Sequence, residues 1–388
     1  MTPHKSYELR KFVSPEFVFG SGSLRLAGRY ATNFGASKVF VVTDKGVIEA
    51  GWTRQVTDSL EEEDLPFIVF SNVSPNPRSD EVMQGVKLYR EAGCDVIVAV
   101  GGGSPIDCAK GIGIVSTNNR DVMEFEGVDQ IPIPGPPLIC IPTTAGSSAD
   151  LSQFAIITDL PSHRKAALVS KMLVPDTSLI DPDTTLTMPK ELTAITGLDA
   201  FTHAVEAYVS NASSPITDLF ALNAVRLITS NLLKAIDEPD NMDYRSNMML
   251  ASLEAGLAFS NASLGATHAM AHSLGGVEDT PHGESNSLLL KYVMEFNYDA
   301  VPQKYEAIGE AMGLDLKKYD YAGGKNAVLE AVAKLIEACG VRGTLAQRGV
   351  RREDIPRLSR QAIKDVCMVT NPRPMSLEDV ERIYERAL

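Results

Sequence analysis

The sequence predicts two domains, an α/β domain built on a parallel sheet followed by an all-helical domain. The chain has 388 residues, more than one typical hydrophobic core holds. In roughly the first half, short apolar runs alternate with amphipathic helical stretches, whereas after Asp181 only helical spacing remains. Residues 181–183 form a turn-prone Asp-Pro-Asp stretch. We therefore expect the α/β domain over residues 1–184 and the helical domain over residues 185–388.

Four β-rich runs are expected to form the strands of the sheet. They are KVFVVT (38–43), PFIVF (66–70), DVIVAV (95–100) and PLICIP (137–142). Runs that are apolar throughout and separated by helices, such as residues 79–92, are typical of parallel strands covered on both faces. In the second half, the apolar spacing predicts helices over 189–209, 215–236, 244–260 and 326–339.

Composition excludes several classes of partner. The net charge of −14 disfavours nucleic acid and anionic membrane surfaces, because both attract basic patches. The sequence contains no run of about 18 apolar residues, so it predicts no membrane span. The five cysteines are scattered, odd in number and without a CxxC pair, which is typical of reduced cysteines in a cytoplasmic protein.

The third predicted strand runs directly into GGGSPID, residues 101–107. The glycines allow close approach of a ligand to the backbone. Ser104 is expected to cap the following helix, with Pro105 in its first turn and Asp107 reaching back to the cap. A helix N-terminus behind glycines attracts phosphate through its free N–H groups and its dipole. A tight strand-to-helix turn without a ligand is the alternative interpretation.

A second polar turn, PTTAGSS at residues 142–148, follows the fourth strand. Open α/β folds bind nucleotides at such loops at the carboxyl ends of neighbouring strands. The first domain is therefore expected to be a Rossmann-like dinucleotide-binding domain. Asp44 follows the first predicted strand and is placed to bind a ribose hydroxyl; its charge would repel a 2′-phosphate, which favours NAD over NADP.

Four of the six histidines lie between residues 203 and 282. Asp199 and His203 are four residues apart and share a helix face, as do His268 and His272, and His282 follows in the tripeptide PHG. One carboxylate and several imidazoles can bind a divalent transition metal without a thiolate. Ordinary helix packing is the alternative.

Two residues near this cluster have other candidate roles. Glu206 lies on or beside the face of Asp199 and His203, where it could support a ligand by a hydrogen bond. His272 need not bind the metal, and could instead face the substrate and move protons.

Together these motifs resemble the iron-containing alcohol dehydrogenase family over nearly the whole chain. The segments that carry the resemblance are GGGSPID (101–107), PTTAG (142–146), GLDAFTH (197–203), residues 265–283 with HAMAH and PHG, and NPR (371–373). The HxxxH pattern followed by PHG is highly specific.

The resemblance implies a Rossmann-like domain and a helical metal-binding domain of the dehydroquinate synthase-like architecture, with the active site in the cleft between them. It implies that Asp199, His203, His268 and His282 bind the metal, and that His272 is a non-ligand histidine beside the nicotinamide. The expected cofactor-binding residues are Asp44, Gly101, Gly102, Gly103, Ser104, Asp107, Thr143, Thr144 and Lys165. Family members are commonly homodimers or larger homo-oligomers.

The expected activity is reversible hydride transfer between a primary alcohol or diol and NAD, with the alcohol oxygen bound to Fe²⁺, or to Zn²⁺, which the same ligands accept. Its partners would be small alcohols and aldehydes. One alternative is a glycerol-dehydrogenase-like polyol oxidoreductase of the same fold. Another is a metal-dependent hydrolase, which would need neither the glycine turn nor Asp44.

One segment departs from the family pattern. After PTTAG the family commonly reads threonine-glycine-serine-glutamate-valine-threonine, whereas this chain has SSADLS at residues 147–152. Small hydroxyl residues are kept, so we expect cofactor binding to survive and substrate preference to be the property affected.

Overall fold

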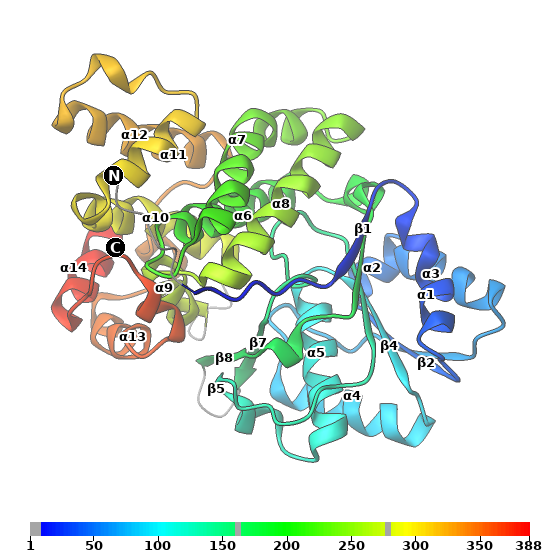
Figure 1. Ribbon diagram of the computed structural model, residues 1–388. Coiled ribbons are helices and arrows are strands. Elements are labelled where there is room, and N and C mark those ends of the chain that lie inside the picture. Colours follow the sequence, from blue (N-terminus) through cyan, green and yellow to red (C-terminus); the bar gives the residue numbers. More distant parts are fainter. Residues whose placement is uncertain (1–8, 160–163, 276–280) are drawn as a thin grey trace, which may run out of the picture.

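The computed structural model describes residues 9–159, 164–275 and 281–388. Figure 1 shows an α/β half, coloured blue through cyan to green, beside a helical half that runs from green to red. The two-part α/β and helical architecture expected from the sequence is therefore confirmed.

One sheet of six parallel strands forms the centre of the α/β half, in the order β1-β9-β6-β4-β2-β3. The strands are β1 Glu16–Phe19, β2 Val39–Val42, β3 Phe67–Phe70, β4 Val96–Gly101, β6 Leu138–Pro142 and β9 Thr177–Ile180. The four predicted strands are confirmed as β2, β3, β4 and β6. The prediction missed β1 and β9, which have four residues each.

Alternate side chains of the central strands pack on opposite faces of the sheet, as strand geometry requires. Phe40 and Val42 pack in one core with helices α4 (Ser79–Ala92) and α5 (Gly103–Asn118). Val39 and Val41 pack in another with α1 (Ala27–Asn33) and α3 (Trp52–Glu62), while the short α2 is Lys45–Glu49. Both faces are covered, which explains the continuous apolar runs in the sequence.

A second sheet, which the sequence analysis did not predict, lies at the edge of the α/β half. It has the order β5-β8-β7, with β5 Gly127–Val128, β7 Phe154–Asp159 and β8 Arg164–Val169. Lys110 of α5 fixes its position: the buried ammonium Nζ donates to the carbonyl oxygens of Ser152, at 2.8 Å, and Phe154, at 2.7 Å. This sheet carries Lys165 toward the first helical turn of α5.

The helical half is built around a core of three long helices, α6, α7 and α8, and α10 packs against both α6 and α9. The helices are α6 Lys190–Val209, α7 Pro215–Asp237, α8 Met242–Ala262, α9 Ala266–Gly275, α10 His282–Asn297, α11 Pro302–Ala311, α12 Tyr321–Ala338, α13 Ile355–Ala362 and α14 Leu377–Ala387. The four predicted helices are confirmed as α6, α7, α8 and α12.

The connection between the halves runs from the end of β9 at Ile180 to the start of α6 at Lys190. The predicted division after residue 184 falls in the 3₁₀ turn Pro182–Thr187 of this connection. The segment before β1 lies on the helical half, because Asn261 of α8 hydrogen-bonds both the N–H and the carbonyl of Val13 (Figure 1).

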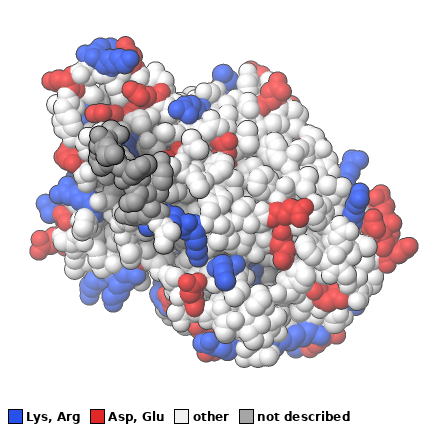
Figure 2. Space-filling view, in the orientation of Figure 1, with Lys and Arg blue, Asp and Glu red and all other residues white. Residues whose placement is uncertain are grey.

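Two other sequence expectations can be compared with the described residues. Helix α7 has the length and mean hydropathy of a membrane-spanning helix, but this is weak evidence, since core helices have the same properties, and α7 packs on α6 and α8. All five cysteines are free and buried. On the face in Figure 2, acidic and basic side chains are interspersed.

Candidate dinucleotide and metal site

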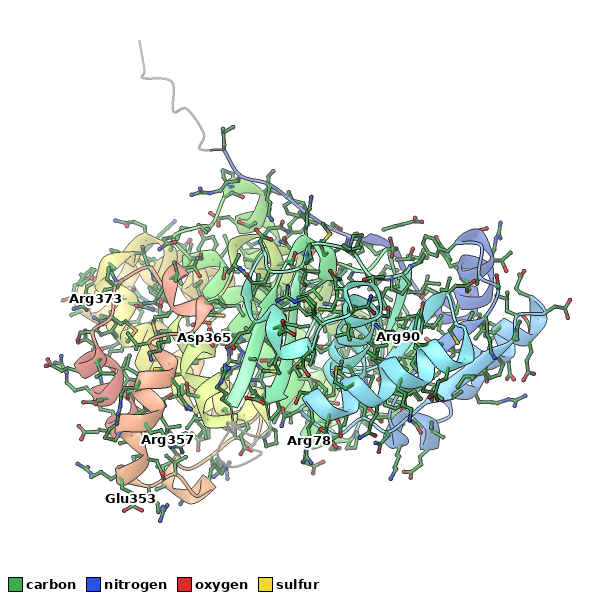
Figure 3. All side chains as sticks on the ribbon, turned by 90° about the horizontal axis from the view of Figure 1, so that it is seen from below. Arg78, Arg90, Glu353, Arg357, Asp365 and Arg373 are labelled. Atoms are coloured by element: carbon green, nitrogen blue, oxygen red, sulfur yellow. The ribbon has the colours of Figure 1, made fainter. Side chains whose placement is uncertain are left out.

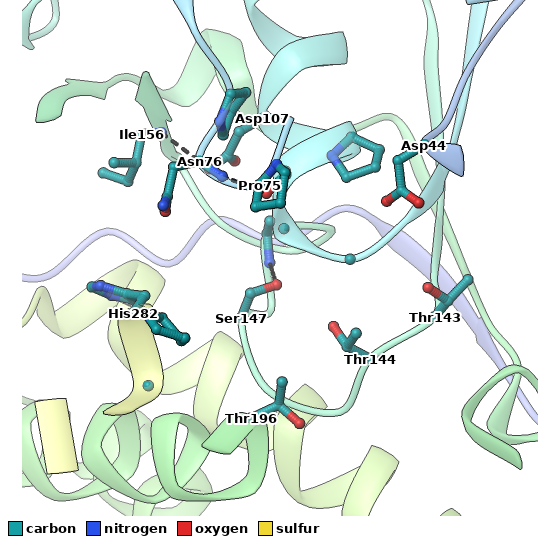
Figure 4. Close-up of a pocket in the computed structure, with 18 of the residues that line it drawn as sticks. Asp44, Pro75, Asn76, Asp107, Thr143, Thr144, Ser147, Ile156, Thr196 and His282 are labelled. Carbon is teal, nitrogen blue, oxygen red and sulfur yellow. Dashed lines mark hydrogen bonds between the residues drawn. The ribbon is translucent and has the colours of Figure 1, made fainter. Parts of the chain in front are cut away.

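A cavity of about 980 Å³ lies between the two halves and is lined by residues from both. Figure 4 shows the loops that follow β2, β3, β4 and β6 on one side of it and His282 and Thr196 of the helical half on the other. Every predicted site residue except Gly101 lines this cavity. Those that do are Asp44, Gly102, Gly103, Ser104, Asp107, Thr143, Thr144, Lys165, Asp199, His203, His268, His272 and His282.

Gly101 shapes the turn that opens the cavity. Its φ of +154° lies in a region that L side chains rarely adopt, and an added Cβ would come within 2.5 Å of the Pro105 ring. Helix α5 then begins at Gly103 with Gly102 as its N-cap. The N-terminus of this 16-residue helix is thus part of the cavity wall, where an anion is favoured.

The predicted capping of α5 by Ser104 is wrong, because the helix starts one residue before Ser104. The Ser104 hydroxyl oxygen instead accepts from the backbone N–H of Asn76. Asp107 does not reach back to a cap either: its Oδ2 accepts from the N–H of Ile156 in β7. Burial raises the pKa of Asp107 to about 6.

The loop after β6 packs tightly on the glycine turn. The N–H of Thr143 donates to the carbonyl of Gly101 at 2.9 Å. A Cβ on Gly102 would lie 3.2 Å from Thr144, and a Cβ on Gly103 would lie 3.1 Å from Ser147. The two predicted cofactor loops are therefore adjacent, with little room for side chains between them.

Asp44 and Lys165 lie at other points of the same cavity. Asp44 follows β2 and caps α2, its Oδ1 accepting from the N–H of Val47 at 2.9 Å. Lys165 of β8 donates from Nζ to the side-chain oxygen of Asn76 at 2.8 Å. Asn76 and its neighbours after β3 form a part of the wall that the sequence analysis missed.

Three of the four predicted metal ligands bring their ligand atoms together. Oδ1 of Asp199 is 3.8 Å from Nε2 of His268 and 4.0 Å from Nε2 of His282, and the three ligand atoms lie within 4.8 Å of one another. His203 is not in this group, but its ring stacks on His268 with 4.7 Å between centroids. Helices α6, α9 and α10 supply these residues.

Hydrogen bonds orient two of the imidazoles toward the cluster. Nδ1 of His268 lies 2.7 Å from Oε2 of Glu206, and Nδ1 of His203 lies 3.2 Å from the carbonyl oxygen of Gly146. Each Nδ1 donates to its oxygen, so in the neutral ring the Nε2 lone pair remains for another partner. The Glu206 carboxylate also accepts from the N–H groups of Gly265, Thr267 and His268 at the start of α9.

The electrostatics of the cluster follow from its burial and its two carboxylates. Burial lowers the pKa of His203 to about 4 and holds that of His282 well below its usual value. Burial acts in the same direction on His268, but Asp199 and Glu206 outweigh it and raise its pKa to about 9. The imidazoles likewise outweigh burial at Asp199, whose pKa is strongly lowered.

These donors fit a divalent transition metal. One carboxylate and oriented imidazoles suit Fe²⁺ and Zn²⁺, and one ligand atom each of Asp199, His268 and His282 lies close enough to the others to share one ion. A cation shared by the Nε2 atoms and Asp199 would offset the charge buried there.

His272 occupies a different place from the predicted ligands. Its Nδ1 lies 2.9 Å from Oδ2 of Asp365, and its ring stacks on that of His282 with 5.3 Å between centroids. Figure 3 shows Asp365 on the inner side of the helical half, while Glu353, Arg357 and Arg373 lie at its periphery. Burial opposes the shift, but the interaction with His272 and the N–H of Cys367 outweighs it and lowers the pKa of Asp365.

Around the metal cluster, sequence reasoning missed three further residues. Asp365 is 93 positions from His272, so no local pattern connects them. Phe259 stacks on His203 at 4.3 Å but is one apolar residue among many in α8. Asn286 could have been found, since it follows His282 by four residues and therefore shares its helix face.

Comparison with known proteins gives matches along the chain. Residues 14–182 match the family model of iron-containing alcohol dehydrogenase, and residues 193–388 match the model of the C-terminal part of the Fe-containing alcohol dehydrogenase family. The 1,3-propanediol dehydrogenase of Citrobacter freundii is 38% identical over 385 residues, which are 98% of this chain and 100% of that protein.

Two further relatives are informative. The NAD-dependent methanol dehydrogenase of Bacillus methanolicus is 33% identical, covering 97% of this chain and 99% of its own. A crystal structure of a 1,3-propanediol oxidoreductase superposes with a TM-score of 0.95 at 36% identity, covering 98% of this chain and 100% of that one.

Proposed function

This chain belongs to the iron-containing alcohol dehydrogenase family, and on that premise we propose that it transfers hydride reversibly between a primary alcohol or diol and NAD in the cavity between its halves. The observation that carries the proposal is that the glycine turn of α5 and the cluster around Asp199 line one cavity. A hydrolase would use only the second of these features.

The residues of the α/β half that line the cavity are proposed to bind different parts of the cofactor. Gly102, Gly103 and Ser104 hold the pyrophosphate at the N-terminus of α5, where the helix dipole favours negative charge. Asp44 binds the adenosine ribose and disfavours a 2′-phosphate, which supports NAD rather than NADP. Thr143, Thr144 and Lys165, which line the same cavity, would line the bound cofactor.

Asp199, His203, His268 and His282 would hold the cation. When bound, a divalent ion supplies Lewis acidity toward an alcohol oxygen. Fe²⁺ is the proposed ion, and Zn²⁺ would be accepted by the same donors. His272 takes the hydroxyl proton at Nε2, while Asp365 holds its Nδ1 and stabilises the imidazolium that forms.

The activity can be tested with purified protein loaded anaerobically with Fe²⁺ or aerobically with Zn²⁺. We expect NADH formation from NAD and at least one member of a panel of short alcohols, diols and glycerol, and a preference for glycerol would favour the polyol alternative. The His268→Ala variant should lose both bound metal and turnover. Asp44→Gly should bind metal normally but gain use of NADP. Inactivity of the wild type in both directions, with NAD and alcohols or NADH and aldehydes, would refute the proposal.

We also propose a homodimer or larger homo-oligomer in the cytoplasm. In the described part of the chain β1 pairs only with β9, so it leaves an open sheet edge flanked by half-exposed Phe17 and Phe19. Light scattering after size exclusion should give at least twice the monomer mass, and Phe17→Lys should reduce it. A wild-type monomer would contradict the proposed assembly.

A further inference from the structure

Asn286 lies at the centre of the proposed ligand cluster. It belongs to α10, its side chain is fully buried, and it shares the face of His282 one turn earlier. Its Nδ2 is 2.8 Å from Oδ1 of Asp199, 3.0 Å from Nε2 of His268 and 3.3 Å from Nε2 of His282. These three atoms belong to the three residues that form the candidate ligand group.

With both imidazoles neutral and carrying their proton on Nδ1, these contacts have one consistent hydrogen-bond assignment. His268 donates from Nδ1 to Glu206, so the Nε2 of the neutral imidazole has only a lone pair to offer. A carboxamide NH₂ group is a pure donor with two hydrogens. It therefore donates to the carboxylate oxygen and to the imidazole lone pairs, and three acceptors share two hydrogens.

A lone pair that accepts a hydrogen bond cannot bind a cation at the same time. We infer that the Asn286 amide is an internal competitor for the cation: it donates to the ligand atoms and must give up the two imidazoles before a metal binds. The inference rests on the proposed metal-dependent function. Asn286 is thus a positioning residue: its hydrogen bonds occupy the ligand atoms in the cation-free protein and thereby lower their affinity for the cation.

This inference predicts the direction in which cation affinity changes when the Asn286 side chain is replaced. A residue that only orients the ligands would change the affinity in the opposite direction. A group that interacts better with the cation-free ligands than with the cation-bound ones weakens binding by the difference. Removing the NH₂ group should therefore tighten cation binding, whereas removing a residue that only orients the ligands should weaken it.

The test compares the full-length wild type with two variants. Asn286→Leu has a side chain of similar volume without a hydrogen-bond donor, and Asn286→Ala has a smaller side chain that cannot clash with the ligands. The Zn²⁺ dissociation constant is measured by competition with a chelator at pH 9.5, above the pKa of His268. We expect both variants to bind Zn²⁺ about tenfold more tightly, corresponding to the loss of one or two hydrogen bonds. Their melting temperature in chelator should fall, and its rise on adding Zn²⁺ should exceed that of the wild type.

Asn231 provides a matched control. It is a buried asparagine of α7 that donates to the carbonyl of Leu227 and accepts from Asn247. Asn231→Leu should lower the melting temperature equally with and without Zn²⁺ and leave the dissociation constant unchanged. Unchanged or weaker Zn²⁺ binding by the Asn286 variants would overturn the inference about Asn286 but not the proposed metal centre. A wild type that binds no Zn²⁺ or Fe²⁺ would overturn the proposed metal centre as well.

Discussion

At the residue scale, Glu206 shows how a side chain that touches no substrate controls the proposed metal site. Its carboxylate binds Nδ1 of His268 and three N–H groups at the start of α9. Glu206→Gln keeps the shape but loses the charge, so we expect cation affinity to fall by about 10- to 100-fold in chelator competition. Glu254→Gln, which changes a carboxylate of α8 bonded to Asn223, should leave the affinity unchanged. Equal affinities for Glu206→Gln and wild type would contradict this role.

The proton on His268 makes cation binding depend on pH. Its pKa is raised from 6.5 to about 9, so the cation-free protein binds this proton at pH 7. Cation binding must release it, and affinity should rise about tenfold per pH unit up to about pH 9 and then level off. In chelator, the stabilisation by the protonated form should be complete below pH 6.5 and be lost toward pH 9. Isothermal titration in buffers of different ionisation enthalpy would detect the released proton, and its absence at pH 7 would exclude the assignment.

At the element scale, the tripeptide PHG has a packing role besides supplying His282. A Cβ on Gly283 would lie 2.1 Å from the carbonyl oxygen of Ile195, which is backbone of α6 and cannot rotate away. Gly283→Ala should therefore push α10 from α6 and lower the free energy of unfolding by about 1–3 kcal/mol, with weaker metal binding. Gly324→Ala in α12 is the control: nothing lies within 4 Å of its Cβ, so it should be neutral or stabilising. Chemical denaturation measures the free energy of unfolding of both variants, and equal values for Gly283→Ala and Gly324→Ala would contradict the packing role of Gly283.

Strands with continuous apolar sequences and strongly periodic helices could be predicted, whereas two strands that contain polar residues could not. The runs at β2, β4 and β6 are apolar because helices cover both sides of the sheet. By contrast, β1 (EFVF) and β9 (TSLI) contain polar residues, and their pairing depends on contacts between residues more than 150 positions apart. The spacing of Asp199 and His268 placed each on a helix, but only the crossing of α6, α9 and α10 brings them together with Asn286, or brings His272 to Asp365.

At the scale of the whole molecule, the segment before β1 joins the two halves that enclose the cavity. Asn261 of α8 accepts from the N–H of Val13 at 2.7 Å and donates to its carbonyl at 3.0 Å, and β1 then pairs with β9 in the main sheet. Asn261→Leu should therefore release residues 9–15 and lower the free energy of unfolding by about 1–2 kcal/mol. Hydrogen exchange should show faster exchange at Val13 and little change in β4. Asn247→Leu, on the same helix but bonded to Asn231, should leave Val13 protected; if it exposes Val13 equally, the attachment depends on α8 as a whole and not on Asn261.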